Sequence, residues 1–290
     1  MKQMILIFSL ILCILVSLTG CTPSETTQAP MEGLEVHYID VGQGDAALIL
    51  CQGQSLLIDG GDNFAEDTVT DYLLGLGLEE LDYILATHPH ADHCGGLDAV
   101  ADTFPVGTVY SPCLEYDSAT FQDFSQAVTD KGGTITVPEA DTTFAVGSAQ
   151  CTILGPRTSE LPENLNNASL ILRIVYGDTA FLFTGDGEYE AETELLDAGC
   201  DVSCDVLKAG HHGSCTSTGY RLLYEAQPQY AVISCGADND YGHPHEEVLS
   251  RLEDADVTTL RTDEAGTIVF RSDGNTLTYQ TTNTNDEKGK

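Results

Sequence analysis

Short apolar segments bounded by Gly, Asp and Asn alternate with amphipathic segments through most of this chain. Runs rich in branched and aromatic residues are typical of strands, whereas longer segments with apolar residues every three or four positions are typical of helices. The predicted strands cover residues 34–40, 45–51, 54–59, 82–86, 107–111, 134–137, 150–154, 168–176, 179–184, 204–208, 229–235, 257–261, 266–271 and 276–281. The predicted helices cover residues 66–76, 95–103, 118–131, 188–198, 217–226 and 245–254.

The order of these elements predicts the class of fold. Strand-rich parts occur in the first and in the second half of the chain, and each has helices of its own. This order favours two sheets packed face to face with helices on the outer sides, a four-layer αββα sandwich of the α/β class. No interior stretch rich in Pro, Gly and Ser reads as a linker. Residues 34–282 are therefore predicted to form a single domain, followed by a disordered polar tail at 283–290.

The beginning of the chain reads as an export signal. Lys2 precedes an apolar segment over residues 4–18, which is too short for a comfortable membrane-spanning helix. The sequence Leu18-Thr19-Gly20-Cys21 has the form of a bacterial lipobox. We expect residues 1–20 to be a signal peptide and residues 21–33 to be a lipidated Cys21 with a flexible tether. The protein would then lie outside the cytoplasmic membrane, anchored by lipid; an uncleaved signal anchor is the alternative.

Charge narrows the choice of partners. The chain has 46 acidic and 11 basic residues, a formal charge of −35 that is spread along its length. Such an excess repels polyanions at long range, which argues against extended duplex nucleic acid unless bound cations invert the local field. No feature of the sequence indicates an obligate protein partner.

Cysteine usage leaves two alternatives open. Of ten cysteines, Cys13 lies in the predicted signal and Cys21 at the predicted lipid site. The other eight show no recognisable disulfide spacing, and several lie inside apolar strand-like runs, so buried free thiols are at least as plausible as disulfides outside the cell. Cys200 and Cys204 lack the second pair that a zinc knuckle needs.

The segment Thr87-His88-Pro89-His90-Ala91-Asp92-His93 carries the strongest chemical signal. It places three imidazoles and a carboxylate in H-x-H-x-D-H spacing, and alternate residues of an extended turn project to the same side. His88 and His90 can therefore hold one metal ion while Asp92 and His93 turn toward a second. Seven of the eight His residues lie in three short clusters, which disfavours the alternative of a solvated loop that happens to contain histidine.

Further candidate residues follow other predicted strands, where loops meet at one edge of a sheet. Asp186 lies between glycines and can bridge two ions, although alone it would read as a turn. One imidazole of His211-His212 can complete the second ion's shell while its neighbour faces the substrate; exposed, idle histidines are the alternative. His243 is a candidate to protonate a leaving group or to hold a phosphoryl oxygen. His245 is expected to cap a helix or face solvent. Asp40 and Asp59 also follow predicted strands.

Together, these motifs resemble the metallo-β-lactamase superfamily. The features typical of the whole superfamily are the His88–His93 motif, Leu57-Ile58-Asp59-Gly60-Gly61 and Thr184-Gly185-Asp186. Other segments resemble, more narrowly, the soluble hydrolase domain of competence DNA-uptake channel proteins: Asp40-Val41-Gly42-Gln43-Gly44-Asp45, Asn167-x-Ser169-Leu170, Lys208-x-x-His211-His212-Gly213-Ser214 and Tyr241-Gly242-His243-Pro244. The resemblance covers nearly all of residues 34–282.

This resemblance implies a four-layer αββα fold with a site for two divalent cations. By carry-over, the first ion would be bound by His88 and His90, the second by Asp92, His93 and His212, and both by Asp186. His212 is preferred over His211 because of the residues that follow it, and this choice stays open. Asp92 would also orient the attacking water, and Asp59 would fix a ligand His. Lys208, His211 and His243 would face the substrate anion, and Asp40, Asn167 and Ser169 would support the site or bind substrate.

One departure from the superfamily pattern affects the choice of metal. Many members have a further His between the first motif and the bridging Asp, whereas this chain has no His from 94 to 210. Asn166-Asn167-Ala168-Ser169 occupies roughly that position. Fewer nitrogen ligands would weaken the selection for zinc and make manganese plausible, because oxygen ligands suit manganese.

Three functions are compatible with these residues. The leading one is a lipid-anchored, metal-dependent hydrolase of phosphodiester bonds, with DNA or a small nucleotide as substrate. The same activated water could instead attack a lactone, an amide or a β-lactam. A lipoprotein that binds metal or solute without turnover is the non-enzymatic alternative.

Overall fold

The computed structural model describes residues 33–158 and 160–283. The predicted signal peptide, the lipid site at Cys21, the tether up to residue 32 and the tail from residue 284 lie outside the described residues, so these predictions stay untested. No helix among the described residues is long and apolar enough to cross a membrane.

The described residues form two mixed sheets. The first sheet has eight strands in the order β15-β14-β1-β2-β3-β4-β5-β6, and the second has seven in the order β13-β12-β11-β10-β9-β8-β7. The first sheet contains β1 (Leu34–Tyr38), β2 (Ala47–Cys51), β3 (Gln54–Ile58), β4 (Leu81–Leu85), β5 (Val106–Tyr110), β6 (Ile135–Thr136), β14 (Ile268–Ser272) and β15 (Leu277–Thr281). The second contains β7 (Thr142–Val146), β8 (Ala149–Gly155), β9 (Ile171–Tyr176), β10 (Thr179–Phe183), β11 (Val206–Lys208), β12 (Tyr230–Ile233) and β13 (Thr258–Arg261).

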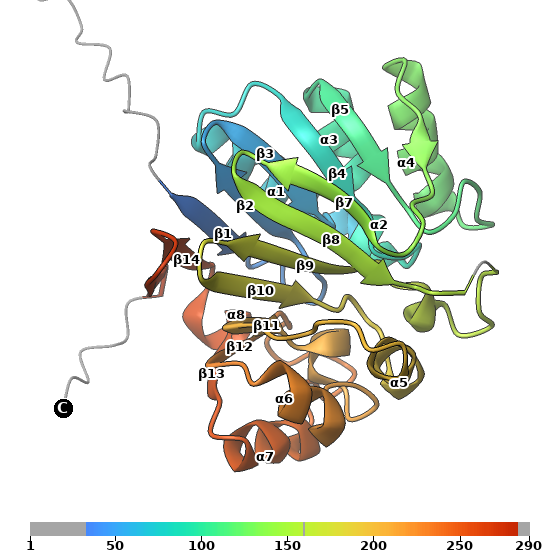
Figure 1. Cartoon of the computed structure of the whole chain (residues 1–290). Helices are drawn as coiled ribbons and strands as arrows, with labels where there is room; N and C mark the ends of the chain where they lie inside the picture. The colour runs from blue at the N-terminus through green and yellow to red at the C-terminus, as the bar shows by residue number, and fades with distance from the viewer. Residues whose placement is uncertain (1–32, 159, 284–290) are drawn as a thin grey trace, which may run out of the picture.

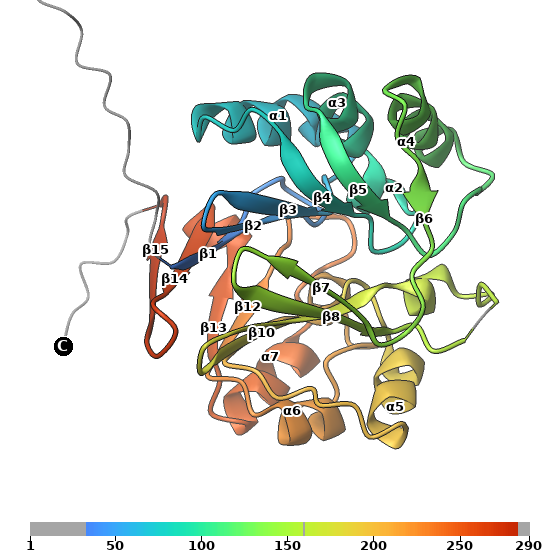
Figure 2. The same cartoon turned by 45° about the horizontal axis from the view of Figure 1, so that its top comes forward.

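Helices cover the outer face of each sheet, as Figures 1 and 2 show. The first sheet is covered by α1 (Glu66–Gly75), α3 (Leu97–Thr103) and α4 (Ala119–Asp130), and the second by α5 (Tyr189–Asp197), α6 (Tyr220–Ala226) and α7 (Glu246–Asp254). Shorter helices and 3₁₀ turns are η1 (Asn63–Ala65), α2 (Ala91–Cys94), η2 (Leu165–Ala168), η3 (Gly210–Gly213) and α8 (Thr262–Ala265). The four-layer αββα sandwich predicted from the sequence is therefore confirmed.

Alternation of side chains along the strands creates the layers. In β1, Val36 points into the core between the sheets, and in β2 Leu48 points toward the outer helices. The inter-sheet core is rich in aromatic residues, with Tyr38 stacked on Phe183 at a centroid distance of 5.5 Å. Successive strand residues face opposite sides of a sheet, one side packed against the other sheet and one against helices. Both faces are therefore buried, and most strands read as continuous apolar runs.

The main differences from the predicted elements are local. Strand β7 was not predicted, because its threonines and half-buried positions give only a weak apolar alternation. The predicted helix over 95–103 corresponds to α3 and begins only at Leu97, whereas the short helix α2 before it was not predicted. The predicted strand over 168–176 begins only at Ile171, after the turn η2. All eight cysteines of the described residues are free thiols, and six of them are buried.

The topology brings distant parts of the chain to one edge of the sandwich. Strands β3, β4 and β5 run parallel in one sheet, and β10, β11 and β12 run parallel in the other. Strand β2 is antiparallel to β3, so the residues that precede β2 lie beside those that follow β3. Loops after parallel strands meet at one edge, which is where α/β proteins build their sites.

Candidate metal centre

The His88–His93 motif folds as a strand end followed by one helical turn. His88 follows β4 and is fully buried, and His90 occupies the N-cap position of α2 in extended conformation. His88 Nε2 lies 2.9 Å from His90 Nδ1, so these two imidazoles converge. The turn of α2 directs Asp92 and His93 to a different point, as the H-x-H-x-D-H spacing predicts.

Asp186 lies between these two points. Its Oδ2 atom is 3.9 Å from His88 Nε2, and its Oδ1 atom is 3.2 Å from His93 Nε2 and 3.5 Å from His212 Nε2. The loop after β10 holds it there, because Ser169 Oγ accepts a hydrogen bond of 3.0 Å from the Asp186 backbone N–H. One carboxylate therefore faces both groups of ligand atoms.

We define the first ligand group as His88 Nε2, His90 Nδ1 and Asp186 Oδ2. The second ligand group is Asp92 Oδ2, His93 Nε2, His212 Nε2 and Asp186 Oδ1. In the second group, His212 Nε2 lies 3.2 Å from Asp92 Oδ2, and His93 Nε2 lies 4.0 Å from the same oxygen. Both nitrogen and carboxylate oxygen ligands suit a divalent transition metal.

Asp59 and Thr87 hold two of these imidazoles. The buried Asp59 carboxylate accepts hydrogen bonds from Thr87 N, Thr87 Oγ1 and His93 Nδ1, at 2.7, 2.7 and 2.9 Å. Because Thr87 Oγ1 donates to Asp59, it is free to accept from His88 Nδ1 at 3.1 Å. Both rings are thereby fixed with Nε2 directed at the ligand groups, as Asp59 was predicted to do for one His.

Asp45 supports the site from the opposite side. Each of Asp45, His93, Asp186 and His212 offers a ligand atom within 4.8 Å of the others. However, Asp45 faces the Nδ1 atoms, at 3.2 Å from His212 and 4.0 Å from His93, whereas Asp186 faces their Nε2 atoms. We therefore assign Asp45 to orienting His212, together with the Ser234 carbonyl oxygen that lies 3.0 Å from its Nδ1.

Lys208 does not lie where the sequence predicted it. Its side chain is only 3% exposed, and its Nζ atom lies 2.7 Å from Asp45 Oδ2 and donates to the Ala209 carbonyl oxygen at 2.9 Å. The prediction that Lys208 faces the substrate is wrong, because β11 is a central strand that points this residue inward. From the sequence, Asp45 was named only within the motif Asp40–Asp45 and was given no role, because it was read as the first residue of a strand, 45–51.

A close approach of two backbones brings Asp45 to the motif. Asp45 N donates to the Asp92 carbonyl oxygen at 3.0 Å, and Gly61 N donates to the Asp45 carbonyl oxygen at 2.7 Å. Gly44 has a φ of +143°, and a Cβ atom there would lie 2.5 Å from the Asp92 carbonyl oxygen. Only glycine allows this contact.

The site's charges favour a bound cation. Burial alone would lower the pKa of His93, but the carboxylates of Asp186, Asp59 and Asp92 outweigh this and raise it well above its ordinary value. For His212 burial is likewise outweighed by Asp186 and Asp45, which raise its pKa to about 10. The clustered carboxylates thus demand positive charge, which protons or a metal ion can supply.

The buried ligand atoms also lack other partners. Within residues 33–158 and 160–283, His93 Nε2, His212 Nε2 and Asp186 Oδ1 are buried and make no hydrogen bond. Buried polar atoms are nearly always satisfied, so such a cluster of unsatisfied atoms fits a missing ligand. The residues present therefore fit a divalent cation, in agreement with the metal site that the motif predicts.

A pocket of about 360 Å³ opens onto both ligand groups. Besides ligand residues it is lined by Gln43, Asn166, His211, Tyr241 and His243. Burial lowers the pKa of His243 to about 4, so its imidazole is neutral near pH 7. A neutral imidazole suits a hydrogen bond to a substrate oxygen better than transfer of a proton to a leaving group.

Three other predicted residues lie away from this pocket's lining. Asp40 accepts a hydrogen bond of 3.2 Å from Gly42 N and so shapes the loop before β2. Asn167 accepts a hydrogen bond of 2.9 Å from Glu188 N and lines a different pocket. His245 occupies the N-cap position of α7, where its Nδ1 accepts from Cys215 N at 2.9 Å.

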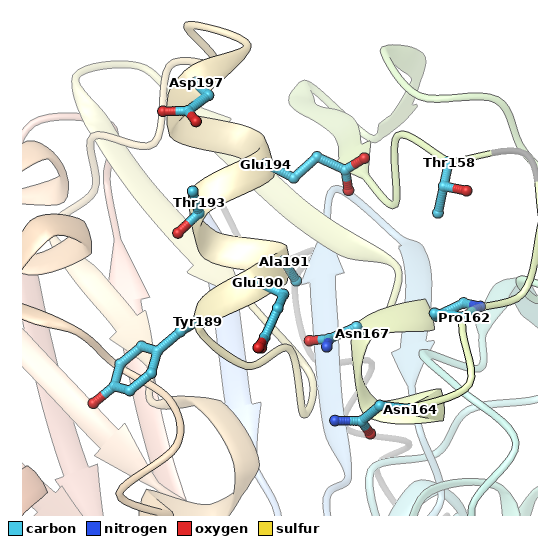
Figure 3. Close-up of a pocket in the computed structure, with 10 residues that line it drawn as sticks. All are labelled: Thr158, Pro162, Asn164, Asn167, Tyr189, Glu190, Ala191, Thr193, Glu194 and Asp197. Atoms are coloured by element: carbon cyan, nitrogen blue, oxygen red, sulfur yellow. The ribbon is translucent and has the colours of Figure 1, made fainter.

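The pocket that Asn167 lines has a volume of about 780 Å³ and lies between α5 and the segment that contains η2 (Figure 3). Its lining includes the carboxylates of Glu190, Glu194 and Asp197 and no histidine. Although it is larger, it lacks the mixed nitrogen and oxygen ligands that the pocket above Asp186 provides. We therefore place the chemistry at the smaller pocket.

The αββα fold with candidate metal ligands at its strand ends is typical of metalloproteins of the metallo-β-lactamase fold. The chain belongs to the metallo-β-lactamase superfamily, whose family description matches residues 39–237. The resemblance inferred from the motifs is thereby confirmed.

Two competence proteins and one solved structure are similar to this chain. The chain is 31% identical over 255 residues to ComE operon protein 3 of Bacillus subtilis (strain 168). The matched region covers 82% of this chain and 33% of that protein. The chain is also 31% identical over 255 residues to competence protein ComA of Neisseria gonorrhoeae, covering 87% of this chain and 34% of that protein. The chain thus spans about a third of the length of these curated relatives. The metallo-β-lactamase fold protein YhfI from Bacillus subtilis has a similar structure, with a TM-score of 0.54 at 14% identity over 79% of this chain and 95% of that one.

Proposed function

We propose that this protein is a metal-dependent phosphodiesterase that acts outside the cytoplasmic membrane and uses two divalent cations, zinc or manganese. The observation that carries the proposal is the convergence of two ligand groups on the two oxygens of Asp186, beneath an open pocket. Two cations bound there would lower the pKa of a water molecule and offset the charge that develops on a phosphoryl oxygen.

The chain's own residues supply positioning around these cations. The Asp92 side chain is 30% exposed, so it reaches the pocket and can orient an attacking water molecule by accepting its hydrogen bond. His243 lies across the pocket, where its neutral ring can donate a hydrogen bond to a substrate oxygen. Tyr241, 66% exposed and stacked on His243, offers an aromatic face to a nucleobase at the mouth.

The basic residues favour a short substrate over duplex DNA. Every Lys and Arg of the described residues already has an acceptor within the protein, namely Lys131, Arg157, Arg173, Lys208, Arg221, Arg251, Arg261 and Arg271. None of these Lys and Arg side chains lines the pocket above Asp186. A nucleotide or another small diester needs no basic groove along its backbone, whereas a long polyanion does. The resemblance of the sequence motifs to competence DNA-uptake proteins keeps DNA as a candidate substrate.

Hydrolysis can be tested with the purified protein, loaded with Mn²⁺ or Zn²⁺, on bis-p-nitrophenyl phosphate, plasmid DNA and a chromogenic β-lactam. We expect turnover of the small diester, slower or no cleavage of the plasmid, and no turnover of the β-lactam. Asp92→Ala should reduce the rate at least about a hundredfold, because it removes a metal ligand and the group that orients water.

The control for this assay is Asp130→Ala, on the exposed end of α4. It should leave the rate unchanged. Equal rates for wild type and Asp92→Ala on all three substrates would refute the hydrolase proposal. Metal binding without any turnover would favour the binding-lipoprotein alternative, and turnover of the β-lactam alone would favour the second hydrolytic one.

The proposed membrane anchor rests on the lipobox at Leu18–Cys21 and is tested separately. Cells that express the full chain and grow on radiolabelled palmitate should yield a labelled protein in the membrane fraction. Cys21→Ser should carry no label, because the thiol that accepts lipid is gone. An expressed wild-type protein without label would disprove lipid anchoring and leave the hydrolase proposal unaffected.

A further inference from the structure

A further imidazole, that of His211, lies beside the first ligand group. The protein ligands of this group are His88, His90 and the shared Asp186, and the sequence has no His from 94 to 210 that could add to them. In the folded chain, however, His211 lies in the turn η3, after β11, close to the Asp186 oxygen that belongs to this group. Its Nε2 atom lies 3.7 Å from Asp186 Oδ2, compared with 3.9 Å for His88 Nε2.

We propose that His211 Nε2 is a ligand of the first cation and that His211 and His212 serve one cation each. This inference rests on the proposed two-cation site and changes the role first predicted for His211, which was contact with the substrate. His211 would thus supply the additional imidazole that the sequence lacks between residues 94 and 210.

The partners of the other ring nitrogen support this assignment. His211 Nδ1 lies 3.4 Å from each of Glu188 Oε1, Thr216 Oγ1 and Asn166 Nδ2. Glu188 is itself held, since it accepts a hydrogen bond of 3.0 Å from Asn166 Nδ2. A carboxylate beside Nδ1 keeps the proton there and leaves the lone pair of Nε2 for a cation. Asp59 stands in the same relation to His93, and Asp45 to His212.

The backbone explains how adjacent residues can serve different cations. His211 and His212 both adopt left-handed conformations, with φ of 49° and 53°. Side chains with a Cβ seldom occupy this region, and residues held in it cluster at functional sites. The conformation is secured by hydrogen bonds from His211 N to the Gly185 carbonyl oxygen, at 3.1 Å, and from Ser214 N to the His211 carbonyl oxygen, at 2.8 Å. The first of these ties His211 to the loop that carries Asp186.

The assignment changes the expected choice of metal. With His211 added, the first ligand group holds three imidazoles and one carboxylate oxygen, a set that suits zinc at least as well as manganese. His243 is then the imidazole left to contact the substrate, since its ring lies 5.6 Å from that of His211 on the pocket side and within the described residues its buried Nδ1 has no partner.

The experiment compares zinc binding by wild type, His211→Gly and His243→Ala, using the full chain stripped of metal and titrated with Zn²⁺ in a calorimeter. Glycine removes the imidazole and suits the left-handed backbone, so this variant should fold, which circular dichroism checks. His243→Ala is the matched control, because it removes an imidazole from the same pocket. X-ray absorption at the zinc edge counts the imidazoles that bind.

We expect wild type and His243→Ala to bind two zinc ions with equal affinities. His211→Gly should keep one tight site, bind the other ion at least about tenfold more weakly, and show fewer imidazoles per zinc. Two sites of wild-type affinity and an unchanged imidazole count in His211→Gly would overturn the assignment while leaving the two-cation site intact. A wild-type protein that binds fewer than two ions would instead refute the two-cation site on which the assignment rests.

Discussion

Asp186→Asn should abolish diester hydrolysis, with a loss of at least about a hundredfold, and should leave fewer than two cations bound per chain. The two oxygens of Asp186 face different ligand groups, so a neutral amide weakens both at once. An amide also removes the negative charge that offsets two cations in a buried site. Loss of partners outside the ligand shell already costs tenfold to a hundredfold in metal sites, and a shared ligand should cost no less.

The measurement pairs the rate on bis-p-nitrophenyl phosphate with the metal content after removal of free ions. Asp197→Asn is the matched control, because Asp197 lies on α5 in a surface ion pair with Arg221 and away from the site. Its rate and metal content should equal those of wild type. If the Asp186→Asn variant keeps both cations and more than a tenth of the wild-type activity, Asp186 is not a ligand shared by the two cations.

Lys208→Met should lower the free energy of unfolding by about 3 kcal/mol, the lower end of the cost of breaking a buried ion pair. Lys208 and Asp45 are 3% and 6% exposed, and removal of the ammonium leaves the Asp45 carboxylate buried without its main partner. Burial tends to raise the pKa of Asp45, but Lys208 and then His212 lower it to about 2, so the carboxylate is charged at neutral pH. His212 remains beside it in the variant, which limits the loss.

Urea unfolding of the metal-free protein measures this effect, because bound cations would add their own stabilisation. The double variant Asp45→Asn/Lys208→Met removes both charges and should recover most of the lost stability, so the two substitutions are not additive. If Lys208→Met is as stable as wild type, or if the double variant is less stable than either single one, the buried pair is not what the distances indicate.

Most of the fold could be predicted because its strands are buried on both faces and read as apolar runs with clear boundaries. The weak element was β7, whose half-buried threonines carry little apolar signal. The short helix α2 and the late start of α3 at Leu97 were missed because Gly95 and Gly96, between these helices, pack closely against the loop after β3. Such breaks depend on what lies next to a segment, which local patterns do not contain.

The candidate site likewise has residues that the sequence indicated and residues that only the folded structure brought to light. Residues His88 to His93 are neighbours in sequence, so their spacing alone indicated two ligand groups. Asp186 and the pair His211-His212 were found because they follow strands, and the preference for His212 came from the resemblance to the superfamily. Asp45 and the inward direction of Lys208 could not be inferred, since their contact joins residues from different sheets.

By itself, the sequence determined the layer order, the metal motif and the family, because periodicity and short-range spacing are properties of the chain. Only the tertiary structure decided which nitrogen of each imidazole faces the ligand groups, that Asp45 contacts Lys208 and His212, and that His211 and His88 both lie near Asp186 Oδ2. These are contacts between residues brought together by the pairing of parallel strands within each sheet and by the packing of two sheets. Their geometry arises only when both sheets place their strand ends at one edge.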